Sequence, residues 1–184
     1  MYLALNEISV TQVSLIEVTL QKCHQLLDYV SWHPEATLRY HASDMILHVD
    51  YDPAYLVLPH ARSRLAGHFF LSSDPTLTRT IRPNAPILTE CKTIQHVVMS
   101  AVEAETAAIF HNAQVARSIR SILKTLGHPQ PPTPIKTDNA AATSFIHQTM
   151  RHKKSKSWDM RYWWLKENLA QSEFDIFWDK GVHN

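Results

Sequence analysis

Glycine is scarce in this chain of 184 residues, which contains only Gly67, Gly127 and Gly181. A loop that cradles phosphate with backbone N–H groups needs several closely spaced glycines, so phosphate-binding loops of that kind are excluded. Cysteine is rarer still, and because Cys23 and Cys91 form no paired motif, we expect them to be reduced structural thiols of an intracellular protein. The formal net charge is only +1, so any nucleic-acid surface has to be a local basic patch.

Long apolar runs are also lacking. None approaches the roughly 18 residues of a membrane-spanning helix, and the N-terminus has no basic region followed by an apolar one, so we expect neither a membrane span nor a signal peptide. The 12 histidines are scattered without paired-ligand spacing, which argues against a histidine-built zinc site. A hydrophobic fraction of 45% leaves room for a core, and the length suggests one domain with an appendage.

Hydrophobic periodicity predicts a helical arm followed by a mixed α/β domain. Residues 17–30 have apolar positions at helical spacing, and Pro34 ends that helix because it disfavours a helical conformation at His33. Residues 73–91 contain three prolines and are predicted to form a loop. Strands are predicted at residues 45–52, 62–71, 93–99, 135–138 and 174–178, and helices at residues 101–126, from residue 139, and at residues 157–169.

The helix at residues 101–126 has clear signals at both ends. Ser100 and Glu103 form a capping-box pattern, in which each side chain satisfies a backbone N–H of the first turn. Gly127 is suited to the position just past the C-terminus. The capping box leaves Glu105 unexplained, since it faces another side of the helix in the first two turns.

The order of these elements predicts where acidic side chains meet. Three strands can form a meander, and the long helix then crosses over to place residues 135–138 parallel to residues 45–52. Asp52 ends the first of these two strands and Asp138 ends the second, while Glu105 lies in the helix between them. Sites in such sheets form at the carboxyl ends of parallel strands, so these carboxylates are expected to converge.

Three converging carboxylates repel one another unless a cation compensates for their charge. Oxygen ligands without cysteine or histidine suit Mg²⁺, with Mn²⁺ as the alternative. Two such ions about 4 Å apart can activate water and stabilise the leaving oxygen of a phosphodiester. A solvated surface carboxylate remains the alternative interpretation of each acid.

Several segments together resemble the C-terminal part of copia-class retrotransposon polyproteins, which comprises the tail of the reverse transcriptase and the ribonuclease H domain. The resemblance covers the chain from about residue 1 to its end. The segments are Leu26-Leu-Asp-Tyr-Val, Pro34-Glu-Ala-Thr-Leu-Arg-Tyr, Ser43-Asp-Met-Ile-Leu, Tyr51-Asp-Pro-Ala-Tyr, Ala61-Arg-Ser-Arg-Leu-Ala-Gly-His-Phe-Phe-Leu, Ser100-Ala-Val-Glu-Ala-Glu, Thr137-Asp-Asn and Lys156-Ser-Trp-Asp-Met-Arg-Tyr.

The resemblance implies an RNase H-like α/β fold: a mixed five-stranded sheet, made of a three-strand meander and two parallel strands, flanked by helices and preceded by the helical arm. It also implies Mg²⁺-dependent cleavage of the RNA strand of an RNA–DNA hybrid. Asp52, Glu105 and Asp138 match the family's catalytic and metal-binding positions, with Asp50 as the near alternative to Asp52. Two departures bear on activity: Pro53 replaces a small residue, and the fourth carboxylate is expected beyond Asn184.

The resemblance further implies how the chain is organised and where it works. Residues 1–40 correspond to the reverse transcriptase tail, which would pack on the polymerase body of the same polyprotein. Residues 41–184 correspond to a ribonuclease H-like domain truncated at its C-terminus. The expected location is the cytoplasm, in a virus-like particle, with the nucleus as the alternative. Three rival functions are an inactive remnant that only binds hybrid or packs on the polymerase, another nuclease or integrase-type enzyme of the same fold, and a purely structural tail.

A basic stretch supplies a candidate surface for the hybrid's phosphates. The alternative is a solvated loop. The residues predicted to bind nucleic acid are Arg151, Lys153, Lys154, Lys156 and Arg161. The neighbouring aromatic residues could stack on bases, but at helical spacing they are more typical of a core or an interface. These are Trp158, Tyr162, Trp163 and Trp164.

Overall fold

The computed structural model describes residues 1–13, 16–74, 83–147 and 156–179, apart from the side chains of Phe145 and residues 156–159. The chain forms two compact units, Met1–Tyr40 and His41–Asn184. No helix in these described stretches is both long enough and apolar enough to cross a bilayer.

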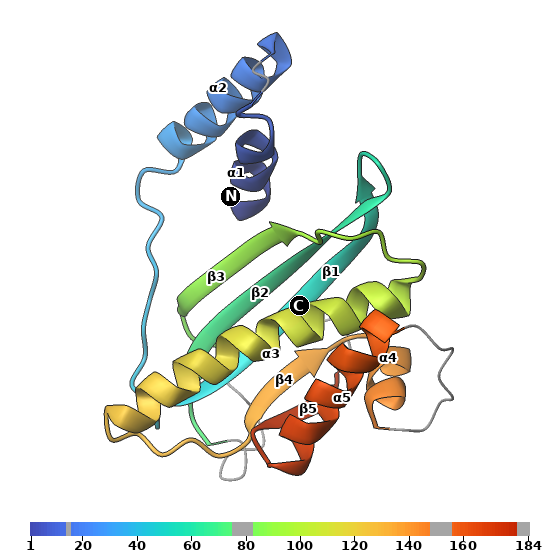
Figure 1. Cartoon of the computed structure of the whole chain (residues 1–184). Coiled ribbons are helices and arrows are strands. Elements are labelled where there is room, and N and C mark those ends of the chain that lie inside the picture. The colour runs from blue at the N-terminus through green and yellow to red at the C-terminus, as the bar shows by residue number, and fades with distance from the viewer. Residues whose placement is uncertain (14–15, 75–82, 148–155, 180–184) are drawn as a thin grey trace. The chain divides into compact units, whose positions relative to one another are not determined.

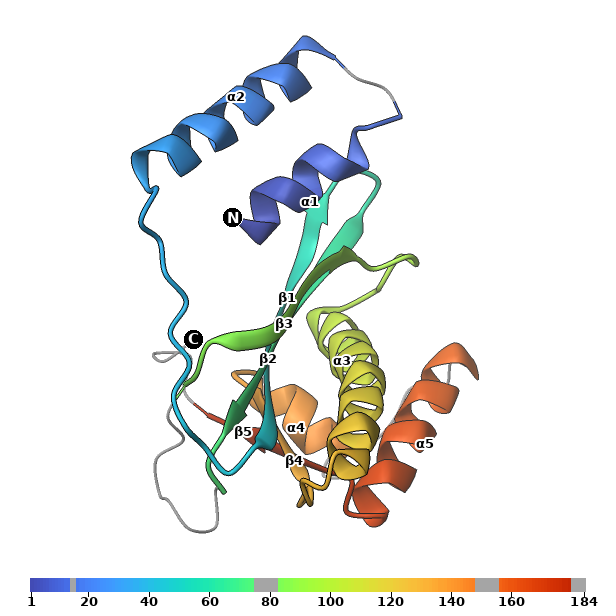
Figure 2. The same cartoon turned by 90° about the vertical axis from the view of Figure 1, so that its left-hand side faces the viewer.

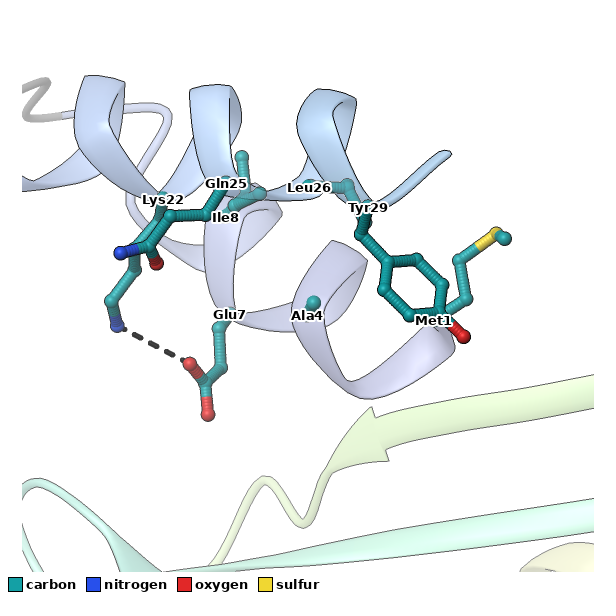
Figure 3. Close-up of a pocket in the computed structure, with 8 residues that line it drawn as sticks. All are labelled: Met1, Ala4, Glu7, Ile8, Lys22, Gln25, Leu26 and Tyr29. Carbon is teal, nitrogen blue, oxygen red and sulfur yellow. Dashed lines mark hydrogen bonds and ion pairs between the residues drawn. The ribbon is translucent and has the colours of Figure 1, made fainter. Parts of the chain in front are cut away.

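The first unit is a pair of helices, α1 (Tyr2–Val10) and α2 (Glu17–Trp32). They pack against each other, and Lys22 forms an ion pair with Glu7, with 3.2 Å between Nζ and Oε2 (Figure 3). As predicted, α2 ends shortly before Pro34. Thr19 is the one buried residue described in α2, so most apolar side chains of this pair are exposed.

The second unit is built on a five-stranded sheet with the order β3-β2-β1-β4-β5 (Figure 1). β1 pairs antiparallel with β2, and β2 pairs antiparallel with β3. β4 lies parallel to β1, and β5 lies parallel to β4. This arrangement confirms the predicted meander with two parallel strands. The strands are β1 (Ile46–Leu58), β2 (Arg62–Ser72), β3 (Pro86–Thr93), β4 (Thr133–Thr137) and β5 (Phe174–Trp178).

Three helices complete this unit: α3 (Ala101–Thr125), α4 (Ala140–Ile146) and α5 (Lys156–Ala170). α3 lies across β1 and β2, and α4 and α5 lie beside it (Figures 1 and 2). Alternate residues of β1 point toward α3 and are buried with its apolar stripe in one core. The β1 residues of this core are Leu47, Val49 and Tyr51.

Both ends of α3 form as their sequence signals predict, with one difference. The Glu103 N–H donates to Ser100 Oγ at 3.1 Å, but the Glu103 carboxylate accepts from the N–H of Met99 at 2.7 Å rather than from that of Ser100. At the other end, Gly127 has φ +90°. The N–H of His128 bonds to the carbonyl of Leu123, which closes a Schellman motif.

The prediction for the third strand is wrong. The strand is Pro86–Thr93, which lies largely in the region predicted to be loop, and residues 94–99 are irregular. Pro86 is tolerated because it is the first residue of an edge strand, where a missing N–H breaks no ladder hydrogen bond. The β-prone residues Ile94 and Val98 are buried as core-filling side chains of a connection rather than as strand residues.

Pro53 does not end the first strand. β1 continues to Leu58 and keeps its pairing with β2, in which Pro53 lies opposite Leu65. The pairing recorded with β4 stops at Asp50. Beyond that residue β1 has a partner on one side only, so the missing N–H of Pro53 costs no hydrogen bond on the other side.

Candidate active site

The carboxyl ends of the two central parallel strands carry an aspartate each. In the register between β1 and β4, Asp50 is opposite Lys136. Two residues further along each strand direction are Asp52, within β1, and Asp138, directly after the last residue of β4. The topology therefore brings these two acids to the same part of the sheet, as the sequence analysis expected.

Glu105 reaches this region from α3. Its side chain is 7% exposed, Oε1 accepts a hydrogen bond from Asn139 Nδ2 at 3.4 Å, and Oε2 has no hydrogen-bond partner among the described residues. Burial raises the pKa of Glu105 to about 7, and the charges of Asp138 and Asp52 act in the same direction. Asn139 and a weak interaction with the Tyr51 hydroxyl lower that pKa in part. Glu105 is thus a buried carboxylate whose negative charge is poorly compensated.

Asp52 belongs to the same electrostatic cluster. Partial burial raises its pKa, and the charge of Asp138 raises it further. Nevertheless, within the described ranges no group of three or more His, Cys, Asp or Glu side chains lies close enough together to hold a metal ion. The three predicted carboxylates are therefore electrostatic neighbours, but their side chains are not gathered closely enough to form a metal-binding group.

Asp50, the alternative to Asp52, has a different environment. Its Oδ2 lies 3.1 Å from Nζ of Lys136, so a cation already compensates for its charge. Both side chains are largely shielded from solvent, with exposed fractions of 30% and 14%. On these contacts, Asp50 is better explained as half of an ion pair between β1 and β4.

Sequence reasoning missed three polar side chains that surround Glu105. Tyr51 is 4% exposed and comes from the core face of β1. Thr137 and Asn139 flank Asp138 at the end of β4. Alternation along β1 did place Tyr51 on the face opposite Asp52, but only the packing of α3 shows that its hydroxyl approaches Glu105.

Of the predicted nucleic-acid-binding residues, Arg161 is the one whose side chain is described. Its Nη1 lies 2.7 Å from Nε2 of His96, and its guanidinium lies 5.9 Å from the ring centroid of Phe110. Burial lowers the pKa of His96, and the charge of Arg161 lowers it further, so this ring accepts the arginine N–H as a neutral imidazole. Residues 151–154 lie outside the described residues, as does the side chain of Lys156.

The aromatic residues of α5 divide between core and surface. Tyr162 is buried, and Trp164 packs edge-on against Phe110 with 5.2 Å between ring centroids, in line with the core interpretation. Trp163 is 61% exposed. The side chain of Trp158 lies outside the described residues.

Comparison with known proteins identifies the fold. No family model matches the chain, and no curated protein matches it. Among solved structures, it is similar to the RNase H1 of the halophilic archaeon Halobacterium salinarum NRC-1, with a TM-score of 0.51 and 13% identity, over 74% of this chain and 87% of that one. It is also similar to LC11-RNase H1 in complex with an RNA/DNA hybrid, with a TM-score of 0.54 and 8% identity, over 75% of this chain and 88% of that one.

A foamy viral protease–reverse transcriptase in complex with double-stranded DNA aligns at a TM-score of 0.49 and 9% identity, over 93% of this chain and 30% of that one, a level of likeness that supports no conclusion. The two ribonuclease H1 structures share the mixed sheet and its helices with this chain, although their sequences differ from it at most positions. The chain therefore adopts the ribonuclease H-like fold.

Proposed function

We propose that this chain is a metal-dependent endonuclease that hydrolyses the RNA strand of RNA–DNA hybrids. The observation that carries the proposal is the state of Glu105. Its carboxylate is buried beside Asp52 and Asp138, and one of its oxygens lacks a partner in the described part of the chain. A fold that needed only stability would not retain such a group, because an uncompensated buried charge is destabilising.

The residues present fit a hard divalent cation, either Mg²⁺ or Mn²⁺. The donors are carboxylate oxygens, and Glu105 Oε2 is left without a hydrogen bond from the described residues. Asp52, Glu105 and Asp138 would hold the ion. A bound divalent ion lowers the pKa of water and stabilises negative charge on a phosphate.

The chain's own residues would bind and orient the hybrid. The basic residues Arg151, Lys153, Lys154, Lys156 and Arg161 would neutralise backbone phosphates, which makes binding dependent on salt. A hybrid would be recognised by its minor-groove shape and its 2′-hydroxyl groups rather than by base sequence. We therefore expect the chain to cleave hybrids without preference for a particular base sequence.

We further propose that the domain works within a copia-class retroelement polyprotein, during reverse transcription in a cytoplasmic virus-like particle or in the nucleus. The support is the resemblance of the segments described above. The exposed apolar side chains of the first unit, among them Leu27 and Trp32, suit a tail that packs on a polymerase body. Residues 1–40 would then be the connection to the reverse transcriptase.

A second candidate function is a non-catalytic domain that binds hybrid or packs on the polymerase. It is favoured by the lack, in the described residues, of a group of three acidic or histidine ligands close enough to hold an ion. Pro53, directly after Asp52, is a further departure from the family pattern.

The test is Mg²⁺-dependent cleavage of an end-labelled RNA–DNA hybrid, with RNA duplex and DNA duplex as substrate controls. Two matched variants separate the adjacent acids: Asp52→Asn and Asp50→Asn. We expect the wild type to cut only the RNA strand of the hybrid, Asp52→Asn to be inactive, and Asp50→Asn to retain activity. Hybrid binding without cleavage by the wild type would favour the second candidate, and cleavage of duplex DNA would favour another nuclease of the same fold.

A further inference from the structure

The polar side chains around Glu105 come from the two chain segments that carry the other two acids of the cluster. Tyr51 directly precedes Asp52 in β1, and Thr137 and Asn139 lie on either side of Asp138. Hydrogen bonds between these side chains and Glu105 therefore also fix the relative positions of the backbone segments that carry the acids.

Some of these hydrogen bonds are present in the structure. The N–H of Asn139 donates to Thr137 Oγ1 at 3.1 Å, and Asn139 Nδ2 donates to Glu105 Oε1 at 3.4 Å. Asn139 Oδ1 accepts from the N–H of Ala142 at 3.0 Å, so the amide is also anchored to the first turn of α4. These contacts join β4, α3 and α4, but none of them reaches β1.

Tyr51 is placed to supply the missing connection. Its hydroxyl is buried and lies near both the Thr137 hydroxyl and the Glu105 carboxylate, yet it completes no hydrogen bond of good geometry with the described residues. Glu105 Oε2 is unpartnered in the same way. Since Thr137 Oγ1 already accepts a hydrogen bond, its own proton is available for Tyr51, and the phenolic proton is then available for Glu105.

We propose that Tyr51 is a positioning residue, whose hydroxyl closes a ring of hydrogen bonds through Glu105, Asn139 and Thr137 when a cation draws the three acids together. The proposal rests on the proposed function, because it concerns the same cluster. Tyr51 would donate to one lone pair of Glu105 Oε2 and leave the other lone pair for the cation. The ring joins β1, β4 and α3, and so fixes Glu105 relative to Asp52 and Asp138.

A purely structural tyrosine would behave differently. A buried hydroxyl without a partner costs free energy, so its removal would leave the fold as stable as before or more stable, with no other consequence. The positioning role instead predicts weaker cation binding with no loss of fold stability. Groups that orient metal ligands typically change affinity or activity by about 10- to 100-fold when removed.

The test uses Tyr51→Phe, with Tyr55→Phe as the control on the same strand, where the ring is half-buried against the same core. Three quantities are measured on the full chain: Mn²⁺ affinity by calorimetry without nucleic acid, thermal stability without metal, and hybrid cleavage. For Tyr51→Phe we expect roughly tenfold weaker Mn²⁺ binding and a similar loss of cleavage, with an unchanged or higher Tm. Tyr55→Phe should match the wild type in all three.

The outcomes separate this inference from the proposed function. If the wild type binds Mn²⁺ and cuts hybrid, but Tyr51→Phe does both equally well, the positioning role is wrong and the proposed function stands. If Tyr51→Phe weakens Mn²⁺ binding but also lowers the Tm, the weaker binding comes from a destabilised fold and the inference is overturned. If the wild type neither binds Mn²⁺ nor cuts hybrid, both fail.

Discussion

Helix α3 buries charged side chains of both signs, and the surroundings of Glu105, near its N-terminus, and Arg120, in its C-terminal half, differ sharply. Arg120, in the C-terminal half, is 2% exposed, and Glu105, near the N-terminus, is 7% exposed. Both belong to the buried stripe of the helix. Burial alone therefore does not distinguish a charge that holds the fold together from one that serves a site.

Arg120 has an acceptor for each of its guanidinium nitrogens. Nε donates to Glu173 Oε2 at 2.9 Å, and Nη1 donates to Thr133 Oγ1 at 2.7 Å and to the carbonyl of Pro131. Nη2 donates to the carbonyl of Gln130 at 3.3 Å. These bonds tie α3 to the start of β4 and to the residue before β5, so Arg120 acts as a structural crosslink.

Glu105 has the opposite character. It receives one long hydrogen bond, from Asn139, and has two acids as electrostatic neighbours. Arg120 stabilises the fold through its contacts, whereas the described residues give the Glu105 carboxylate no positively charged partner. The contrast agrees with the proposal that the N-terminal end of α3 is the functional end and its C-terminal end the structural end.

The largest expected effect comes from removing the Glu105 carboxylate. Glu105→Gln should reduce hybrid cleavage by about a thousandfold or more, because the cation that would stabilise the developing negative charge by several kcal/mol loses a ligand. Glu103→Gln is the matched control, since Glu103 lies two residues away and serves as a helix cap, a role that glutamine also fills. Single-turnover cleavage measures both variants. Equal activity of Glu105→Gln and Glu103→Gln would show that Glu105 does not belong to the site.

The next largest effect is expected on fold stability, from replacing Arg120 in the C-terminal half of α3. Arg120→Met should lower the free energy of unfolding by about 3 kcal/mol, because Glu173 and the acceptors at Thr133, Pro131 and Gln130 lose their donor. Arg117→Met is the control: Arg117 is exposed and lies 6.0 Å from the ring centroid of Trp164, so we expect a loss below about 1 kcal/mol. Urea unfolding measures both. A loss for Arg120→Met no greater than for Arg117→Met would contradict the crosslink.

The raised pKa of Glu105 gives a pH dependence with a definite sign. Between its ordinary value of 4.5 and about 7, the folded metal-free protein keeps a proton that the unfolded chain releases, so stability falls as pH rises through this range. A shift of that size corresponds to at most roughly 3.4 kcal/mol, and we expect about 2 kcal/mol because solvent screens the charges of the exposed neighbours Asp52 and Asp138. Glu105→Gln should therefore be more stable than the wild type at pH 8 and equal to it near pH 4.5. A difference that does not vary with pH would show that the charge is already compensated.

The smallest effect is expected at Glu173. Although its partial burial pulls the other way, the hydrogen bond from Arg120 holds the pKa of Glu173 below its ordinary value. The ion pair therefore contributes stability above that ordinary value and loses it as pH falls through the lowered one. Glu173→Gln should cost about 1 kcal/mol at pH 7, and the difference from the wild type should vanish in acid. If Glu173→Gln is still less stable than the wild type at pH 2, the negative charge of Glu173 is not the source of the stabilisation.

The sequence was informative where local chemistry decides structure. Ser100 and Gly127 mark the two ends of α3 because capping and positive φ are properties of single residues and their immediate neighbours. Local sequence pattern predicted β1, β2 and β5, and the crossover rule then placed Asp138 near Asp52. A glycine inside a strand is typical of a bulge or of a close approach, and at Gly67 the structure shows a close approach, since a Cβ there would clash with Asn112 Oδ1.

Features that depend on distant partners could not be predicted. The third strand was misplaced because Ile94 and Val98 look like strand residues, whereas the fold buries them in its core as part of a connection. Arg120 looks like an ordinary helix residue until β4 and Glu173 bring its acceptors. The alternation along β1 predicts that Tyr51 faces the core, on the side of the sheet opposite to Asp52. It does not predict that Tyr51 approaches Glu105, because that contact depends on the position of α3.

The most direct test of the contrast between the two ends of α3 is to measure Mn²⁺ binding to the metal-free chain. Electron paramagnetic resonance monitors this binding in the absence of nucleic acid. Glu105→Gln and Glu173→Gln each remove one negative charge, the first at the functional end and the second at the structural end. We predict that Glu105→Gln weakens Mn²⁺ binding by about tenfold or more, while Glu173→Gln binds as the wild type does. Equal binding by the wild type and Glu105→Gln would contradict the account.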